Sequence, residues 1–146
     1  MNKAAELITA SQEVGVASHV LTGEAATAYI KQVLARFSPQ KTTGHLAIQH
    51  DSITVPLEPN EFTYSQHLPA EPVFVFFDQQ GPDAGHVVVI EPGNRLCDVL
   101  ANAYGMEYFV SNQAVAYLLA VNWYVIEATG TATEWLTPLA TGQPAQ

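Results

Sequence analysis

Apolar residues recur at helical spacing in the N-terminal part of the chain. Residues 4–14 and 24–37 each predict a helix. In the second segment, the apolar stripe consists of Ala25, Ala28, Tyr29, Val33 and Phe37. Thr22 stands before this helix, where its side chain is expected to accept hydrogen bonds from first-turn N–H groups, and Pro39 ends the helix.

From Gly44 onward the pattern changes to that of β-strands. The predicted strands are residues 45–49, 53–57, 62–65, 72–77, 86–90, 106–111 and 117–128. The first two are expected to form a hairpin, with Pro56 placing the second near an edge because proline donates no hydrogen bond to a ladder. Residues 72–77 and 86–90 are continuous apolar runs, which favour central positions in the sheet.

Two further segments complete the predicted elements. The apolar face of a third helix consists of Leu96, Val99, Leu100 and Ala103, and Gly105 is expected to end that helix. Segment 117–128 is apolar on both faces, so it predicts a central strand with Trp123 in the core and helices over both faces of the sheet. After Gly130, a short helix is expected to hold Trp135.

Together these elements predict an α+β fold. A mainly antiparallel central sheet of about five to seven strands carries N-terminal helices and one inserted helix. A length of 146 residues fits a single domain. Within 1–146 we expect an N-terminal helical arm at 1–40, a sheet-containing core at 44–138 and a frayed tail at 140–146.

The composition indicates a folded core and an acidic surface. Hydrophobic residues make up 48% of the chain and charged residues 13%, which excludes disorder throughout. The formal net charge of −9 argues against binding to nucleic acid or to an anionic membrane. Every Lys and Arg lies at or before Arg95, so the rest of the chain is wholly acidic. This charge either serves solubility or attracts a basic partner.

The single cysteine and the N-terminal sequence bear on location. Cys97 has no partner for an intramolecular disulfide, which favours a reducing compartment. Polar residues interrupt the apolar run that a signal peptide needs, and they also interrupt 108–126, the longest nearly uncharged segment. We therefore expect a cytoplasmic location and no membrane span.

No pattern in the sequence predicts a metal site, a cofactor or a catalytic residue. The histidines, at positions 19, 45, 50, 67 and 86, lack the spacing of metal ligands. Asp98 beside Cys97 is expected to raise the thiol pKa, which argues against a Cys–His nucleophile. Glu107 and Glu127 are not expected to form an acid/base pair, because the predicted hairpin places Glu107 near Ala120 and Glu127 several residues away.

Asn122 interrupts the predicted strand 117–128 and has two interpretations. A buried amide needs hydrogen-bond partners, so Asn122 is expected to tie a neighbouring loop or helix end to the sheet. In the alternative interpretation, Asn122 and Tyr124 line a pocket in a small-ligand-binding or enzymatic α+β domain.

The run EYFVSNQAVAYLLAVNWYVIEATG, residues 107–130, resembles the closing section of small bacterial proteins related to the SUKH superfamily of immunity proteins. In both, a strand that ends in a short polar turn is followed by an aromatic residue, a long apolar strand and a glycine. The resemblance implies an α+β domain that binds and neutralises a toxin, often a basic nuclease, without catalysis of its own.

Charge, size and this resemblance lead to one functional expectation. The protein is expected to be an acidic binding protein rather than an enzyme, and its partner to be a basic toxin domain. The candidate contacts are the acidic loop residues Glu58, Glu61, Asp78 and Asp83, because loops present side chains without disturbing a sheet. The pocket near Asn122 and Tyr124 remains the alternative.

Overall fold

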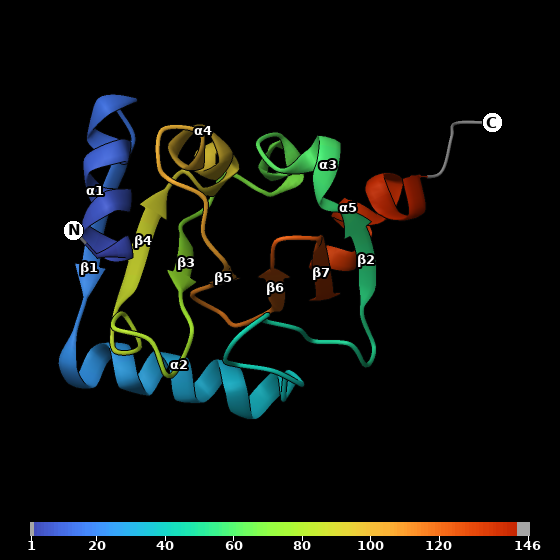
Figure 1. The fold of residues 1–146 in the computed structure, drawn as a ribbon, viewed down its shortest axis with the longest axis horizontal. Helices are drawn as coiled ribbons and strands as arrows, with labels where there is room; N and C mark the ends of the chain where they lie inside the picture. Colours follow the sequence, from blue (N-terminus) through green and yellow to red (C-terminus); the bar gives the residue numbers. More distant parts are fainter. Residues whose placement is uncertain (1, 143–146) are drawn as a thin grey trace.

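The computed structural model describes residues 2–142 of the chain, which form one sheet with helices on both of its faces (Figure 1). The strands are β1 (Ala17–Leu21), β2 (Ile53–Pro56), β3 (Val73–Phe76), β4 (Val87–Glu91), β5 (Tyr108–Asn112), β6 (Tyr117–Val121) and β7 (Val125–Gly130). The α-helices are α1 (Lys3–Glu13), α2 (Gly23–Phe37), α3 (Leu57–Asn60), α4 (Leu96–Leu100) and α5 (Ala132–Leu136). Short 3₁₀ helices are η1 (Tyr64–His67), η2 (Gly93–Arg95) and η3 (Thr137–Gly142).

The sheet has the order β1-β4-β3-β5-β6-β7-β2, and each neighbouring pair is antiparallel. This arrangement confirms the predicted α+β fold with an antiparallel central sheet. The apolar runs that form β3 and β4 lie inside the sheet, as predicted. Strand β2, which contains Pro56, lies at an edge, where a residue without an N–H leaves no ladder bond unmade.

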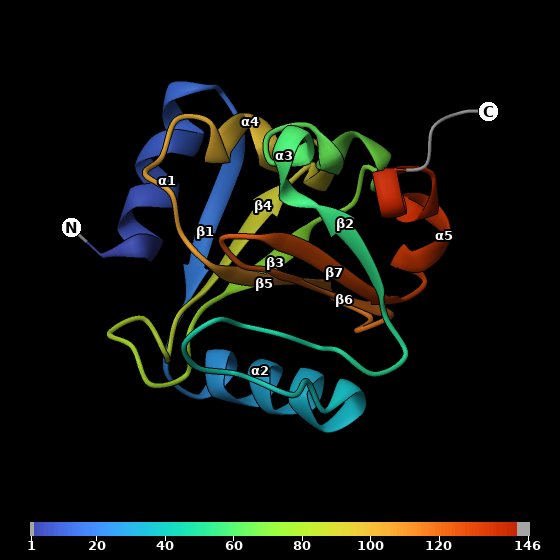
Figure 2. The same cartoon turned by 45° about the vertical axis from the view of Figure 1, so that its right-hand side comes forward.

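Helices cover both faces of the sheet, and alternation along each strand divides the apolar side chains between them (Figure 2). On β5, Tyr108 and Val110 belong to the core under α1, α4 and α5, whereas Phe109 belongs to the core under α2. On β6, Leu119 and Leu118 divide in the same way. The sheet is therefore buried on both faces, which explains its nearly continuous apolar strands.

Strand β1 is the element that the hydrophobic pattern did not reveal. It lies inside 1–40, the segment interpreted as a helical arm, and it pairs with β4 along its whole length. As an edge strand it is only partly buried, so its sequence lacks a strong apolar signal.

Thr22 does stand at the N-cap of α2, but its side chain makes no capping hydrogen bond, contrary to expectation. The buried stripe of α2 consists of Ala26, Tyr29, Ile30 and Val33.

The predicted hairpin between 45–49 and 53–57 is wrong. Only Ile53–Pro56 forms a strand, and it pairs with β7. Residues 45–49 run without regular structure across the α2 face, where Leu46 and Ile48 are buried. The N–H groups of Leu46, Ile48 and Gln49 bind side chains, and Ala47 forms only an isolated bridge with Lys41, which the alternation of apolar residues does not reveal.

The predicted strand 117–128 is two strands joined by a tight turn. Strands β6 and β7 pair with each other, and residues 122–124 connect them. Trp123 is therefore 48% exposed in the turn and not in the core, contrary to expectation. The hydrophobic pattern predicted a single strand because β6 and β7 are each buried on both faces, so their sequences form one continuous apolar run.

Several smaller expectations have clear outcomes. Residues 62–65 do not form an edge strand but lead into η1, with Tyr64 buried. The inserted helix is confirmed by α4, although it ends at Leu100 and not at Gly105 as expected, and the short helix that holds Trp135 is α5. Of the predicted tail 140–146, residues 140–142 end η3 and residues 143–146 lie outside the described residues. No helix within residues 2–142 combines the length and apolar character needed to cross a membrane.

Candidate functional site

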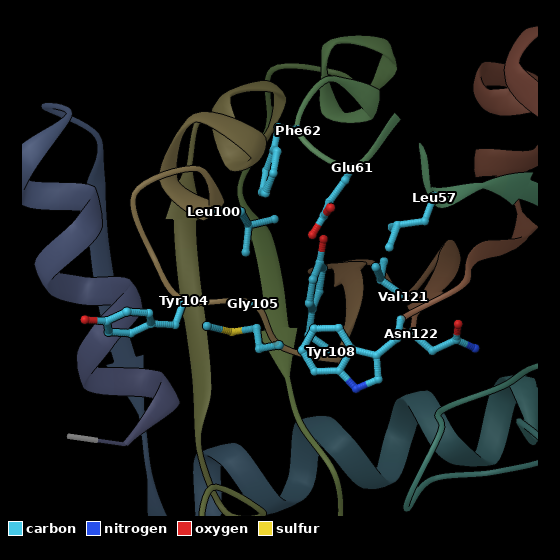
Figure 3. Close-up of a pocket in the computed structure, with 11 residues that line it drawn as sticks. Leu57, Glu61, Phe62, Leu100, Tyr104, Gly105, Tyr108, Val121 and Asn122 are labelled. Carbon is cyan, nitrogen blue, oxygen red and sulfur yellow. The ribbon is translucent and has the colours of Figure 1, made fainter. Parts of the chain in front are cut away.

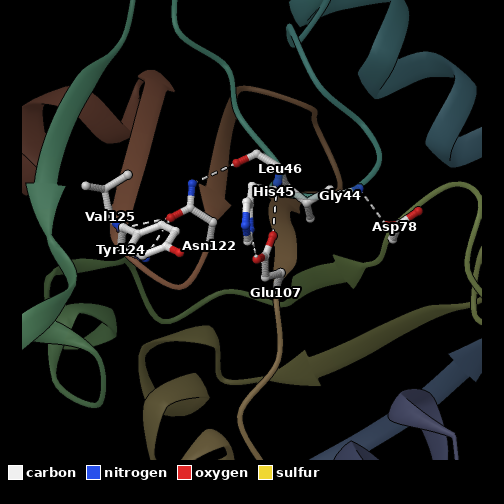
Figure 4. Close-up of polar contacts among 8 residues, drawn as sticks. All are labelled: Gly44, His45, Leu46, Asp78, Glu107, Asn122, Tyr124 and Val125. Carbon is white, nitrogen blue, oxygen red and sulfur yellow. Dashed lines mark hydrogen bonds and ion pairs between the residues drawn. The ribbon is translucent and has the colours of Figure 1, made fainter.

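The turn between β6 and β7 is built by the side chain of Asn122 (Figure 4). Its Oδ1 accepts the backbone N–H groups of Tyr124 at 2.8 Å and Val125 at 3.0 Å. Its Nδ2 donates to the carbonyl of Leu46 at 3.1 Å. The expectation that Asn122 ties a neighbouring loop to the sheet is confirmed. With these contacts made, the Asn122 amide holds the protein's own backbone in place, and the side chains of Trp123 and Tyr124 that follow it are partly exposed.

Two carboxylates on the α2 face of the sheet hold the irregular segment 44–49 against it. Glu107 accepts the N–H of Leu46 at 3.0 Å and contacts the Nδ1 atom of His45 at 2.6 Å. Glu127 accepts the N–H of Ile48 at 2.5 Å and that of Gln49 at 3.2 Å. Glu107 and Glu127 therefore share a face of the sheet, but each serves as a fixed acceptor for main-chain N–H groups.

Four large apolar side chains are exposed among the described residues, and they gather at the end of the sheet that carries this turn. They are Phe62, Tyr104, Trp123 and Tyr124. Phe62 follows α3, Tyr104 follows α4, and the other two occupy the β6–β7 turn. The Leu57 N–H donates to the Tyr124 carbonyl, which joins the start of α3 to the turn. Clustered exposed aromatics mark contact surfaces in folded proteins.

A narrow pocket opens at this cluster of aromatic residues (Figure 3). Its lining residues are Leu57, Glu61, Phe62, Leu100, Tyr104, Gly105, Met106, Tyr108, Val121, Asn122 and Trp123. A second hollow adjoins it across Leu57, Glu61 and Trp123, and adds Glu58 and Tyr124 to the surface. We call Glu58, Glu61, Phe62, Trp123 and Tyr124 the acidic aromatic surface.

No protein-family model, curated protein or solved structure matches this chain.

The charge of the acidic aromatic surface comes from Glu58 and Glu61. Neither carboxylate forms an ion pair or a hydrogen bond with any residue in 2–142. Among the described residues that line the two hollows, none is Lys, Arg or His. A separate basin that also borders Trp123 contains Lys3 and Lys41, which offset the charges of Asp78 and Glu107 there. The negative field is therefore concentrated on the side of Trp123 where Glu61 lies.

Beneath the pocket lies a buried polar cluster of Tyr64, Tyr108 and Cys97. The two tyrosine hydroxyls contact each other at 2.7 Å, and Cys97 Sγ accepts the Ser65 N–H at 3.4 Å. Burial raises the pKa of Tyr64 and of Tyr108 well above the ordinary value, and it raises the pKa of Cys97 to about 11. These groups are therefore neutral at physiological pH, and the thiol lacks the character of a nucleophile.

The four acidic residues predicted as contacts have different surroundings. Glu58 is exposed, Glu61 lines the pocket, and both belong to the acidic aromatic surface. Asp78 is half-buried, and its carboxylate accepts the N–H groups of Gly44 and Gln80, each at 2.8 Å. It borders the basin that contains Lys3 and Lys41 rather than the pocket.

The prediction that Asp83 contacts a partner is wrong, because Asp83 is 2% exposed and cannot present its carboxylate to another protein. It accepts the N–H groups of Lys3 at 3.0 Å and Ala4 at 3.4 Å, and it contacts His86 Nδ1 at 2.9 Å. Burial alone raises the pKa of Asp83, but these hydrogen bonds outweigh it and hold the pKa below its ordinary value. Asp83 fastens the start of α1 to the loop between β3 and β4.

The described residues contain no group of three or more metal-ligating side chains close enough to hold an ion. The two close His–carboxylate pairs, His45 with Glu107 and His86 with Asp83, use carboxylates that also hold backbone N–H groups. Each pair therefore has a structural task that accounts for its position.

Sequence reasoning missed Phe62, Tyr104 and Trp123 as surface residues. A usable signal for the turn was present, because asparagine favours turns by accepting N–H groups of the residues that follow it. With Asn122 interpreted in this way, Trp123 and Tyr124 become exposed turn residues. Nothing local to Phe62 or Tyr104 indicates that they approach the turn, since that proximity depends on how the segments fold together.

Proposed function

We propose that this protein is a binding protein that captures a basic protein partner on the acidic aromatic surface. The observation that carries the proposal is the convergence of exposed aromatic side chains with two unpaired carboxylates at one end of the sheet. Large aromatic side chains supply much of the binding energy at protein interfaces. Unpaired carboxylates attract a basic partner and accelerate its association.

The partner proposed is a toxin domain, which the protein neutralises by direct binding. Support comes from the resemblance of residues 107–130 to immunity proteins, since this run contains β5, β6, β7 and the turn with Trp123 and Tyr124. The proposal includes a cytoplasmic location, which the lone buried Cys97 supports. Neutralisation by binding requires no catalytic residue of this chain.

The alternative of a small-ligand site built on Asn122 receives less support. Both polar atoms of the Asn122 amide are bonded to main-chain groups of Leu46, Tyr124 and Val125. Tyr124 is 67% exposed and lines an open hollow rather than an enclosed cavity. A ligand at this position would have to compete with contacts that hold the turn together.

The proposal is tested by co-expression with a toxin-bearing protein encoded by an adjacent gene. Growth rescue and the association rate would be measured for the wild type, for a Glu58→Lys/Glu61→Lys double variant and for Glu91→Lys. Glu91 is exposed and lies at the far end of β4, so it is a matched control. We expect the double variant to slow association about tenfold or more at low salt and to weaken rescue.

Two outcomes would contradict the proposal. The first is equal association and rescue by the double variant and the wild type, which would remove this surface from the interface. The second is turnover of a small molecule by the purified protein in the absence of any rescue, which would favour an enzyme. Trp123→Ala adds an independent check, because it removes contact area without changing charge.

A further inference from the structure

The pocket beside Glu61 combines one carboxylate with aromatic walls, which is the chemistry that recognises a planar cation. Phe62 and Trp123 contribute ring surface to it and Leu57 contributes an apolar wall, whereas the Tyr104 ring points away from it toward α1 in Figure 3. Aromatic faces attract cations, and they attract them more strongly where water is excluded. An anionic ligand is disfavoured, because Glu61 has no cation beside it among the described lining residues.

The carboxylate of Glu61 has a defined position above the buried cluster. In Figure 3 it points toward the hydroxyl end of Tyr108, at the inner side of the pocket. The main chain at this point is held by Cys97, whose thiol donates to the Glu61 carbonyl at 3.5 Å. Because the main chain is fixed at Glu61, the two oxygens of its carboxylate can accept both hydrogen bonds of a bidentate donor.

The indole of Trp123 is positioned by Gly105. A Cβ atom added at Gly105 would lie 2.9 Å from the Cζ3 atom of the indole ring, so the ring packs directly on the glycine main chain. This close approach fixes one wall of the pocket although Trp123 lies in an exposed turn. A side chain at position 105 would displace that wall.

We infer that the guanidinium group of an arginine on the partner binds at the mouth of this pocket, where the adjoining hollow between Glu61 and Trp123 gives it room, an inference that rests on the proposed function. Guanidinium is planar, weakly hydrated and always charged, and it stacks on aromatic rings while it donates two parallel hydrogen bonds to a carboxylate. A lysine ammonium is compact and strongly hydrated, and it presents no flat face to the rings. The arginine enters from the acidic aromatic surface and anchors the partner there.

The test uses short peptides in place of the partner. Acetyl-Gly-Arg-Gly-amide would be titrated into the full-length protein while the indole N–H signal of Trp123 is followed by NMR. The matched peptide carries citrulline, which keeps the shape of arginine and lacks its charge, and a third peptide carries lysine. The protein variants are Glu61→Gln, which preserves side-chain size, Gly105→Ala, and the remote control Glu91→Gln.

We expect saturable binding of the arginine peptide and at least about fivefold weaker binding of the citrulline and lysine peptides. Glu61→Gln should weaken binding of the arginine peptide about tenfold, and Glu91→Gln should leave it unchanged. Gly105→Ala should shift the free indole signal and weaken binding. Equal binding of arginine and citrulline, or unchanged binding by Glu61→Gln, would overturn the inference.

The two proposals fail in different ways. If Glu58→Lys/Glu61→Lys abolishes partner capture while Glu61→Gln leaves both peptide and partner binding unchanged, only the arginine pocket is overturned. If the arginine peptide binds as expected and no basic protein is neutralised, the proposed function is overturned and the pocket stands.

Discussion

The carboxylate of Glu127 on β7 accepts the main-chain N–H of Ile48 at 2.5 Å, although 79 positions separate the two residues. The same oxygen accepts the N–H of Gln49. Glu127 is buried, and these N–H groups replace the contacts with water that its side chain loses. In return, the carboxylate satisfies N–H groups that have no strand to pair with, and it fixes segment 44–49 across the α2 face of the sheet.

Removing the Glu127 carboxylate should therefore loosen segment 44–49. Glu127→Ala is expected to lower the free energy of unfolding by about 1–3 kcal/mol, because it leaves main-chain N–H groups without an acceptor. Glu127→Gln keeps one carbonyl oxygen and should cost less. Urea unfolding gives the stability, and hydrogen exchange at Ile48 and Gln49 reports the local effect. Exposed Glu134→Ala is the control, and unchanged exchange in Glu127→Ala would contradict the role.

Trp123 should contribute less to stability than a core residue of the neighbouring strand. Leu119 is fully buried, and Leu119→Ala is expected to cost about 2–5 kcal/mol. Trp123→Ala should cost less than about 2 kcal/mol, because the ring is half in water. Denaturant unfolding of both variants makes the comparison. A larger loss for Trp123→Ala than for Leu119→Ala would place the indole in the core.

Asp83 should make the stability of the protein depend on pH in the acid range. Its folded pKa lies below the unfolded value of about 3.9, so its contribution is present above that pH and is lost as pH falls through the folded pKa. Asp83→Asn should be less stable by about 1–2 kcal/mol at pH 7, and this gap should narrow below about pH 4.

Urea unfolding at a series of pH values measures that gap. Asp51→Asn is the control, because the Asp51 side chain is 96% exposed and its stability effect should be close to zero throughout. A gap between Asp83→Asn and the wild type that stays constant down to about pH 2 would show that the Asp83 charge contributes nothing to folding.

Cys97 should resist thiol reagents in the native protein. Burial raises the pKa of its thiol to about 11, so little thiolate exists at pH 8, and the side chain is 2% exposed. An aromatic disulfide reagent should react slowly with the folded chain and rapidly in urea. Fast labelling without denaturant would indicate that the region around Tyr64 and Tyr108 opens readily.

The sequence by itself determined the class of fold and most of the core. Continuous apolar runs identified β3 and β4 as interior strands, Pro56 placed β2 at an edge, and helical spacing located α1 and α2. These features follow from local rules, because a strand or helix buried on a known face must repeat its apolar residues with that element's period. The structural role of Asn122 was likewise predictable, since a buried amide requires partners wherever it lies.

Only the tertiary structure decided which acidic residues are available to a partner. Asp83 and Glu58 are both acidic residues outside the strands, yet Asp83 is buried against the start of α1 and Glu58 is exposed. The difference depends on Lys3, which lies 80 positions from Asp83 in the chain. The acidic aromatic surface has the same origin, because α3 and the β6–β7 turn meet only when β2 pairs with β7. Local patterns reflect how each residue is buried on average, whereas a site depends on which distant segments the folded sheet brings together.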